Sequence, residues 1–261
     1  MSTAARLTRV LVSGASRGIG RAIALRLSRD AHVIAIVRKP EDARSLSDAS
    51  GGHIGSLALD LSDRAARARV VEHAERSFGP IDGLVHAAGL GEHRRLADVD
   101  HTQLDRHLEL NVIAGFDLAQ SLAGSLRQRR APGSLLFLSS TLADRPAPTT
   151  SVYAITKGAV SSMTRALAIE LAPERIRVNA IAPGVIDTAM VRAPRLAEGE
   201  PMPEGEALRA REDAQIAELA KLHPIGRVGT VDEIADAAAF LLHAELATGT
   251  ILTIDGGLSL A

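Results

Sequence analysis

The chain has 261 residues, 46% of them hydrophobic and 22 of them glycine, so it can bury a large core, and its length fits one α/β domain over residues 1–261 better than two. Its formal net charge of -1 comes from interspersed acidic and basic residues, which gives no basic surface for nucleic acid or for a membrane. Cysteine is absent, the histidines lack metal-ligand spacing and no long apolar run occurs, so we expect a soluble, cytoplasmic protein without disulfide or metal site.

The first predicted strand, residues 10–12, runs into a glycine-rich turn. Glycines allow unusual backbone angles and close approach of a pyrophosphate, and the N-terminus of the helix that follows attracts anions. The turn therefore predicts a dinucleotide site formed by Gly14, Ser16, Arg17, Gly18, Ile19 and Gly20. The alternative is that the glycines serve only the geometry of a loop.

A second strand, residues 32–37, ends at Val37 and is followed by Arg38. Many NAD-binding folds place an acidic residue at this strand end, where it holds the ribose 2′-hydroxyl. Val37 is neutral, and Arg38 can offer its planar guanidinium to a 2′-phosphate, with Arg17 approaching from the glycine turn. The pair favours NADP(H) over NAD(H), unless both arginines are solvated surface residues.

Two more strands end in short segments that are candidates for ligand contact. The third, residues 54–59, leads into Asp60-Leu61, and the fourth, residues 81–85, leads into residues 86–89, His-Ala-Ala-Gly. Small residues at such a strand end let the backbone pass close to a ligand. The alternative for Asp60 is that it only helps the chain turn towards the next helix.

A long amphipathic helix is predicted from His101 to about Gln128. Asn111 interrupts it, and an asparagine that faces the interior of a helix usually has a hydrogen-bonding reason. The alternative is that Asn111 is a tolerated polar residue without a role.

The chain is organised around the stretch from Phe137 to Lys157. An apolar strand precedes Ser140, so this hydroxyl lies at a carboxyl strand end. Tyr153 and Lys157 lie one turn apart on the helix that begins near Ser151. An ammonium beside a phenol favours the phenolate, so we expect Lys157 to lower the pKa of Tyr153 towards neutrality, while Ser140 binds the reacting oxygen.

These residues together resemble the short-chain dehydrogenase/reductase family. Ser140 is followed at the family's spacing by Tyr153-x-x-x-Lys157, and the first turn resembles the family's T-G-x-x-x-G-x-G with Ser13 in place of threonine. The resemblance covers nearly the whole chain. It implies a Rossmann-type α/β fold, a doubly wound, mostly parallel seven-stranded sheet with helices on both faces, and it makes Ser140, Tyr153, Lys157 and Asn111 the catalytic residues.

The resemblance also assigns individual contacts. It implies that the Asp60 carboxylate and the Leu61 backbone contact adenine, and that Ala88 and Gly89 pass the cofactor ribose, although His86-Ala87 replace the usual Asn-Asn. Asn111 would kink its helix and hold a water that connects Lys157 to solvent. The nicotinamide end would be held by Pro183, Gly184, Ile186 and Thr188, with Tyr153 and Lys157 also contacting the cofactor.

The C-terminal third contains two strands and a segment of different character. Strands are expected at residues 176–181 and 249–255, with an amphipathic helix from Val231 to Leu242 between them. The segment from about 189 to 223 is rich in proline, glycine and charge, which suggests a substrate lid above the nicotinamide, mobile until cofactor and substrate bind. Substrate contacts are expected from Leu142, Arg145 and Met190.

The predicted function is NADP(H)-dependent hydride transfer to or from a small-molecule carbonyl or secondary alcohol, similar to a ketone or 3-oxoacyl reductase. Other possibilities on the same scaffold are an NAD-dependent alcohol or cis-diol dehydrogenase, a dehydratase or epimerase with bound cofactor, and a non-catalytic dinucleotide sensor. The family commonly pairs the helices that correspond to 101–128 and 151–172 across a twofold axis, so we expect a homotetramer, or at least a dimer.

Overall fold

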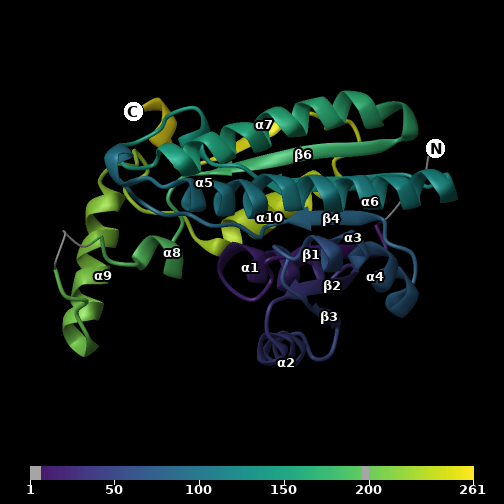
Figure 1. The fold of residues 1–261 in the computed structure, drawn as a ribbon, viewed down its shortest axis with the longest axis horizontal. Coiled ribbons are helices and arrows are strands. Elements are labelled where there is room, and N and C mark those ends of the chain that lie inside the picture. The colour runs from purple at the N-terminus through teal and green to yellow at the C-terminus, as the bar shows by residue number, and fades with distance from the viewer. Residues whose placement is uncertain (1–6, 196–199) are drawn as a thin grey trace.

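The computed structural model describes residues 7–195 and 200–261, which form one seven-stranded sheet (Figure 1). The strand order is β3-β2-β1-β4-β5-β6-β7, and every pairing is parallel. This confirms the predicted Rossmann-type sheet. The strands are β1 (Arg9–Ser13), β2 (His32–Val37), β3 (Ile54–Ala58), β4 (Gly83–His86), β5 (Gly133–Leu138), β6 (Ile176–Pro183) and β7 (Ile251–Ile254).

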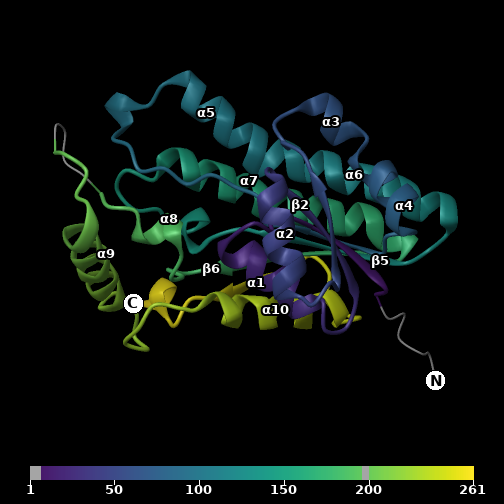
Figure 2. The ribbon, with the colours of Figure 1, turned by 90° about the horizontal axis from the view of Figure 1, so that it is seen from below.

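Helices cover both faces of the sheet because successive strand residues point to opposite sides (Figure 2). In β1, Val10 and Val12 pack in one apolar core, whereas Leu11 packs in the other. The first core is closed by α1 (Gly18–Leu27), α2 (Pro40–Ala49) and α10 (Val231–His243). The second is closed by α4 (Val70–Phe78), α6 (Ala114–Arg129) and α7 (Ser151–Leu171).

The helix predicted from His101 to about Gln128 is present but is not uniform. It consists of α5 (His101–Leu108), a π-helical turn (Glu109–Ile113) and α6. Asn111 lies in this turn and is buried. Single π turns within α-helices occur often at functional sites, so the irregularity marks this residue.

The parallel register brings the ends of the central strands to one edge of the sheet. Ser13 is opposite Ile36 of β2 and His86 of β4, and His86 is opposite Phe137 of β5. The strand order reverses between β1 and β4, where α/β sheets of this kind bind ligands beyond the carboxyl ends of their strands.

The remaining α-helices of the described chain are α3 (Arg64–Ala68), α8 (Ala189–Arg192) and α9 (Gly205–Ala220), and short 3-10 helices lie at Leu96–Asp98, Thr141–Ala143, Ala172–Glu174 and Leu258–Leu260. Both views place α9 at one end of the molecule, beyond α8 (Figures 1 and 2). Residues 196–199 of the expected lid lie outside the described residues. Within the part of the chain that is described, no helix has the length and apolar character needed to cross a membrane.

Candidate active site

A pocket of about 780 Å³ runs along the carboxyl edge of the sheet. Every residue that the sequence assigned to the cofactor lines this one pocket, and so do Ser140 and Met190. The assigned residues are Gly14, Ser16, Arg17, Gly18, Ile19, Gly20, Arg38, Asp60, Leu61, Ala88, Gly89, Tyr153, Lys157, Pro183, Gly184, Ile186 and Thr188.

The glycine turn between β1 and α1 accepts no side chain at two of its positions. Gly14 has φ +69°, and a Cβ there would lie 2.5 Å from the Ala88 nitrogen. A Cβ on Gly20 would lie 2.3 Å from the Gly14 oxygen. The first turn of α1 has neither a side-chain cap nor an acidic residue, so its N–H groups remain available to an anion. The turn therefore fits a dinucleotide pyrophosphate.

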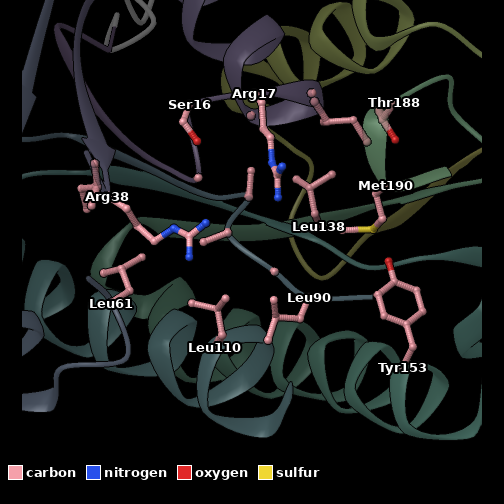
Figure 3. A pocket seen from close by; sticks show the side chains of 18 of the residues that line it. Ser16, Arg17, Arg38, Leu61, Leu90, Leu110, Leu138, Tyr153, Thr188 and Met190 are labelled. Carbon is pink, nitrogen blue, oxygen red and sulfur yellow. The ribbon is translucent and has the colours of Figure 1, made fainter. Parts of the chain in front are cut away.

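Three of the predicted catalytic residues meet at another part of the pocket. The Lys157 ammonium donates to the Leu138 carbonyl at 2.6 Å and lies 5.4 Å from the centroid of the Tyr153 ring. Ser140 lies two residues beyond the end of β5 and caps the short turn that follows, accepting from the Leu142 N–H at 3.1 Å. Tyr153 points into the pocket (Figure 3). A phenol, a hydroxyl and an ammonium thus converge where a substrate oxygen could bind.

Burial controls the protonation of these groups. It raises the pKa of Tyr153 to about 12, against a smaller lowering by Ser140, and it lowers the pKa of Lys157 to about 8. The expectation that Lys157 brings the pKa of Tyr153 towards neutrality is therefore wrong for the ligand-free pocket. The phenol keeps its proton at neutral pH and can act as a donor.

The phenol can be titrated on its own because the chain has one tyrosine and no tryptophan. We expect the phenolate absorbance of the folded protein to stay low through pH 10, the ordinary pKa, and to rise only near the raised value of about 12. Denatured protein, in which burial is lost, should titrate near 10. An absorbance midpoint at or below 10 in the folded protein would contradict the raised pKa.

Asn111 clamps the loop after β4. Its side-chain amide donates to the Leu90 carbonyl and to the Thr156 hydroxyl, each at 2.9 Å, and its oxygen accepts from the Leu90 N–H at 2.7 Å. A Cβ on Gly89 would lie 3.2 Å from the Asn111 oxygen and 3.8 Å from the Lys157 ammonium. Asn111 and Lys157 therefore flank the same glycine. A direct hydrogen bond between them does not form among the described residues, so the water-mediated relay stays a prediction.

Comparisons with known proteins identify the family. Residues 14–259 match the family model described as enoyl-(acyl carrier protein) reductase. The chain is 32% identical to L-xylulose reductase of Mesocricetus auratus over 252 residues, 95% of each chain. The chain belongs to the short-chain dehydrogenase/reductase family. It is an oxidoreductase acting on CH–OH or C=O groups.

Two further members of the family add detail. Carbonyl reductase (NADPH) 2 of Sus scrofa is 32% identical over 254 residues, 95% of each chain. The structure of 3-ketoacyl-(acyl-carrier-protein) reductase from Brucella melitensis, complexed with NADH, superposes with a TM-score of 0.83 at 31% identity, covering 97% of this chain and 98% of that one. The names of these relatives include both NADPH and NADH. Membership of the family therefore does not determine which of the two cofactors this chain binds.

The part of the pocket where the sequence predicts the adenosine carries two arginines. Figure 3 shows the guanidinium groups of Arg17 and Arg38 pointing into the pocket, with Arg38 on the side farther from Tyr153. Neither group forms a hydrogen bond or an ion pair with another described residue. Asp60 lies nearby: hydrogen bonds from Ser62 lower its pKa first, and the positive charge of Arg38 lowers it further. The carboxylate is ionised, but its Oδ1 is occupied by Ser62.

The expected substrate contacts are only partly brought together. Met190 lines the pocket, and its sulfur lies 2.9 Å from the position of a Cβ on Gly91. Leu142 and Arg145 are not among the lining residues. Arg145 donates to the carbonyls of Ser259 and Ala261, the latter at 2.9 Å, so it holds the C-terminal residues instead of facing a substrate. The expectation for Arg145 is corrected accordingly.

The sequence also missed several residues that shape the site. Leu90 and Leu110 line the pocket (Figure 3), and the only signal for Leu110 is its place beside Asn111. Arg67 is fully buried, although it lies in a helix segment that reads as solvated. It donates to the Leu61 carbonyl at 2.5 Å. Its guanidinium also pairs with Glu109 at 2.8 Å and with Asp117 at 2.6 Å. Arg67 thus ties Leu61 at the wall of the pocket to Glu109 in the π turn.

A group of three or more histidine, aspartate or glutamate side chains placed to hold a metal ion does not occur within residues 7–195 and 200–261.

Proposed function

We propose that this protein is an NADP(H)-dependent oxidoreductase that interconverts a ketone and a secondary alcohol. The observation that carries the proposal is the division of one pocket between two chemistries. One end holds Ser140, Tyr153 and Lys157. Away from that end lie Arg17 and Arg38, which form no hydrogen bond or ion pair with another residue in the described part of the chain. The glycine turn, which carries Arg17, fits the pyrophosphate that joins the two halves of a dinucleotide.

The residues of the chain position a substrate and move one proton. A bound nicotinamide cofactor supplies the hydride. In the reductive direction the Ser140 hydroxyl holds the carbonyl oxygen, and the Tyr153 phenol gives its proton to that oxygen as it becomes an alcohol. Lys157, held by the Leu138 carbonyl, places a cation beside the phenol and stabilises the phenolate that remains. Asn111 keeps the Leu90 backbone and the adjoining turn in place for the proposed proton relay.

Three features support this assignment over its rivals. The phenol is protonated at neutral pH, as a reductase requires of its acid. All four expected catalytic positions are filled, whereas a sensor without catalysis would not need them. The names of similar proteins include a carbonyl reductase with NADPH, an L-xylulose reductase and a 3-ketoacyl reductase, which all point to carbonyl substrates.

A panel of ketones and secondary alcohols, each assayed with NADPH or NADP⁺ and with NADH or NAD⁺, tests the proposal. We expect consumption of NADPH with at least one ketone and the reverse reaction with the matching alcohol. A dehydratase or epimerase would convert its substrate without a net change in nicotinamide absorbance. Absence of redox turnover across the panel, with cofactor bound, would favour that reading or a sensor.

We further propose that α8 and α9 act as the substrate lid. None of the residues of α9 is buried, and polar contacts join the two helices: Arg192 pairs with Asp213 at 2.8 Å, and Gln215 donates to the Val191 carbonyl at 2.5 Å. Elements held by few apolar contacts open easily. We expect slow hydrogen exchange in α9 only when cofactor and substrate are both bound. Equal protection in the ligand-free protein would contradict gating.

The same proposal includes a homotetramer. Large apolar side chains are exposed on the helices expected to pair: Phe116 on α6, and Ile155 and Ile169 on α7. These side chains lie on the helices whose counterparts the family commonly pairs across a twofold axis. Light scattering at micromolar concentration should report a tetramer, and Ile169→Asp should shift the mass towards smaller species. A monomeric mass for the unmodified protein would rule this out.

A further inference from the structure

His86 occupies the end of β4, at a position where the family usually has asparagine, and only 3% of its surface is exposed. Its ring bridges two elements that are distant in sequence. Nδ1 lies 2.8 Å from the Ser13 hydroxyl at the end of β1, and Nε2 lies 3.1 Å from the Leu110 carbonyl in the π turn. Neither contact was expected from the sequence.

The chemistry of the partners determines where the protons lie. A carbonyl oxygen only accepts, so Nε2 must carry the proton that is donated to Leu110. In the neutral ring Nδ1 is then an acceptor, and the Ser13 hydroxyl donates to it. The Ser13 oxygen in turn accepts from the Ala88 N–H at 3.4 Å. One directed chain of hydrogen bonds therefore runs from the loop after β4, through β1, to the π turn.

The π turn explains why the Leu110 carbonyl is open to His86. The Ala114 N–H bonds to the Glu109 carbonyl, five residues back, and not to Leu110, four residues back. Gly115 gives the ring its space, because a Cβ there would lie 2.8 Å from His86 Cδ2. The helix can approach this close to β4 only with glycine at that position.

The peptide that His86 holds leads directly into Asn111, whose side chain clamps Leu90. We propose that His86 is a positioning residue: through Nε2 it holds the Leu110–Asn111 peptide in the π turn, and through Nδ1 it holds Ser13 at the start of the glycine turn. His86 thereby links the glycine turn between β1 and α1 to Asn111, the residue of the proposed proton relay. The catalytic consequence rests on the proposed role of Asn111, whereas the hydrogen-bond assignment does not.

The ring stays neutral over the working pH range. Burial lowers the pKa of His86 to about 4, the Leu110 carbonyl opposes this, and the positive charges of Lys157 on α7 and Arg67 on α3 lower it further. Protonation would place a positive charge in a buried site near two other positive charges. The ring therefore stays neutral and carries its proton on Nε2.

Two substitutions of His86 each remove one of its two hydrogen bonds. His86→Asn retains an acceptor near the place of Nδ1 and loses the donor to Leu110, whereas His86→Gln retains a donor near the place of Nε2 and loses the acceptor for Ser13. We expect His86→Asn to lower kcat about tenfold and to leave the Kd for NADPH nearly unchanged. His86→Gln and Ser13→Ala should each raise the Kd for NADPH several-fold, and the double variant should be no worse than either because both remove one bond.

Leu122→Ala is the matched control, because Leu122 is fully buried on α6 but takes no part in this chain of hydrogen bonds. It should destabilise the fold and leave kcat per folded molecule unchanged. Wild-type kcat in His86→Asn, or equal losses of kcat in His86→Asn and Leu122→Ala, would overturn the proposal.

Nitrogen-15 chemical shifts of the His86 ring in the unmodified protein provide a test that needs neither substrate nor variant folding. We expect the Nε2–H tautomer at neutral pH, with and without NADPH. An Nδ1–H or a charged ring overturns the assignment. Failure of every ketone to react would sink the proposed function while leaving this measurement and the NADPH affinities intact.

Discussion

Tyr153→Phe should lower kcat by about 10² to 10⁴-fold, the usual contribution of a general acid, while the fold and the affinity for NADPH are retained. The substitution removes only the phenolic oxygen, and the half-buried ring continues to pack beside Lys157. In the ligand-free pocket the phenol holds its proton because burial raises its pKa to about 12, so the unmodified enzyme always has a donor at neutral pH. The measurement is kcat under saturating ketone and NADPH.

The affinity for NADPH, followed by its fluorescence without interference from tryptophan, serves as the internal control. Ser140→Ala should show a smaller loss in kcat, because Ser140 only holds the oxygen that Tyr153 protonates. A kcat of Tyr153→Phe within a few-fold of that of the unmodified enzyme would show that Tyr153 is not the proton donor. Another group would then have to supply the proton.

Arg38→Asp should reverse or abolish the preference for NADPH over NADH. A hydrogen bond to a charged group contributes about 1.5 to 3 kcal/mol, so one arginine corresponds to roughly tenfold to a hundredfold in preference. Arg38 follows the end of β2 and points into the pocket, where an aspartate would repel a 2′-phosphate but accept from a ribose hydroxyl. We expect kcat/KM with NADPH to fall steeply and kcat/KM with NADH to change little.

Arg29→Asp makes the same change of charge at an exposed position in the turn before β2, at the opposite edge of the sheet, and should leave the preference unaltered. Arg17→Ala should lower the preference for NADPH without favouring NADH, because it removes a cation and adds no carboxylate. Equal catalytic efficiency of the unmodified enzyme with NADH and NADPH would show that the two arginines do not hold a phosphate.

The residues that line the pocket could be predicted from the sequence because each motif follows a strand. Gly14 follows β1, Arg38 follows β2, Ser140 follows β5 and Gly184 follows β6, and parallel strands bring their carboxyl ends to one edge. Strand periodicity and glycine placement are local properties, so they can be read without coordinates. Tyr153 and Lys157 were also predictable as neighbours, since residues four apart share a helix face.

Only the tertiary structure shows which side chains are buried and which residues far away in the sequence they contact. The pKa of Tyr153 rises because packing buries the phenol, a quantity that the adjacent Lys157 does not reveal. Arg145 turns to the C-terminal carbonyls, and Arg67 is buried against carboxylates, through contacts between residues far apart in the chain. His86 joins Ser13 to Leu110 only because a π turn frees one carbonyl and Gly115 leaves room for the ring. Sequence spacing determined which residues surround the pocket, and burial and long-range hydrogen bonding determined their protonation and orientation.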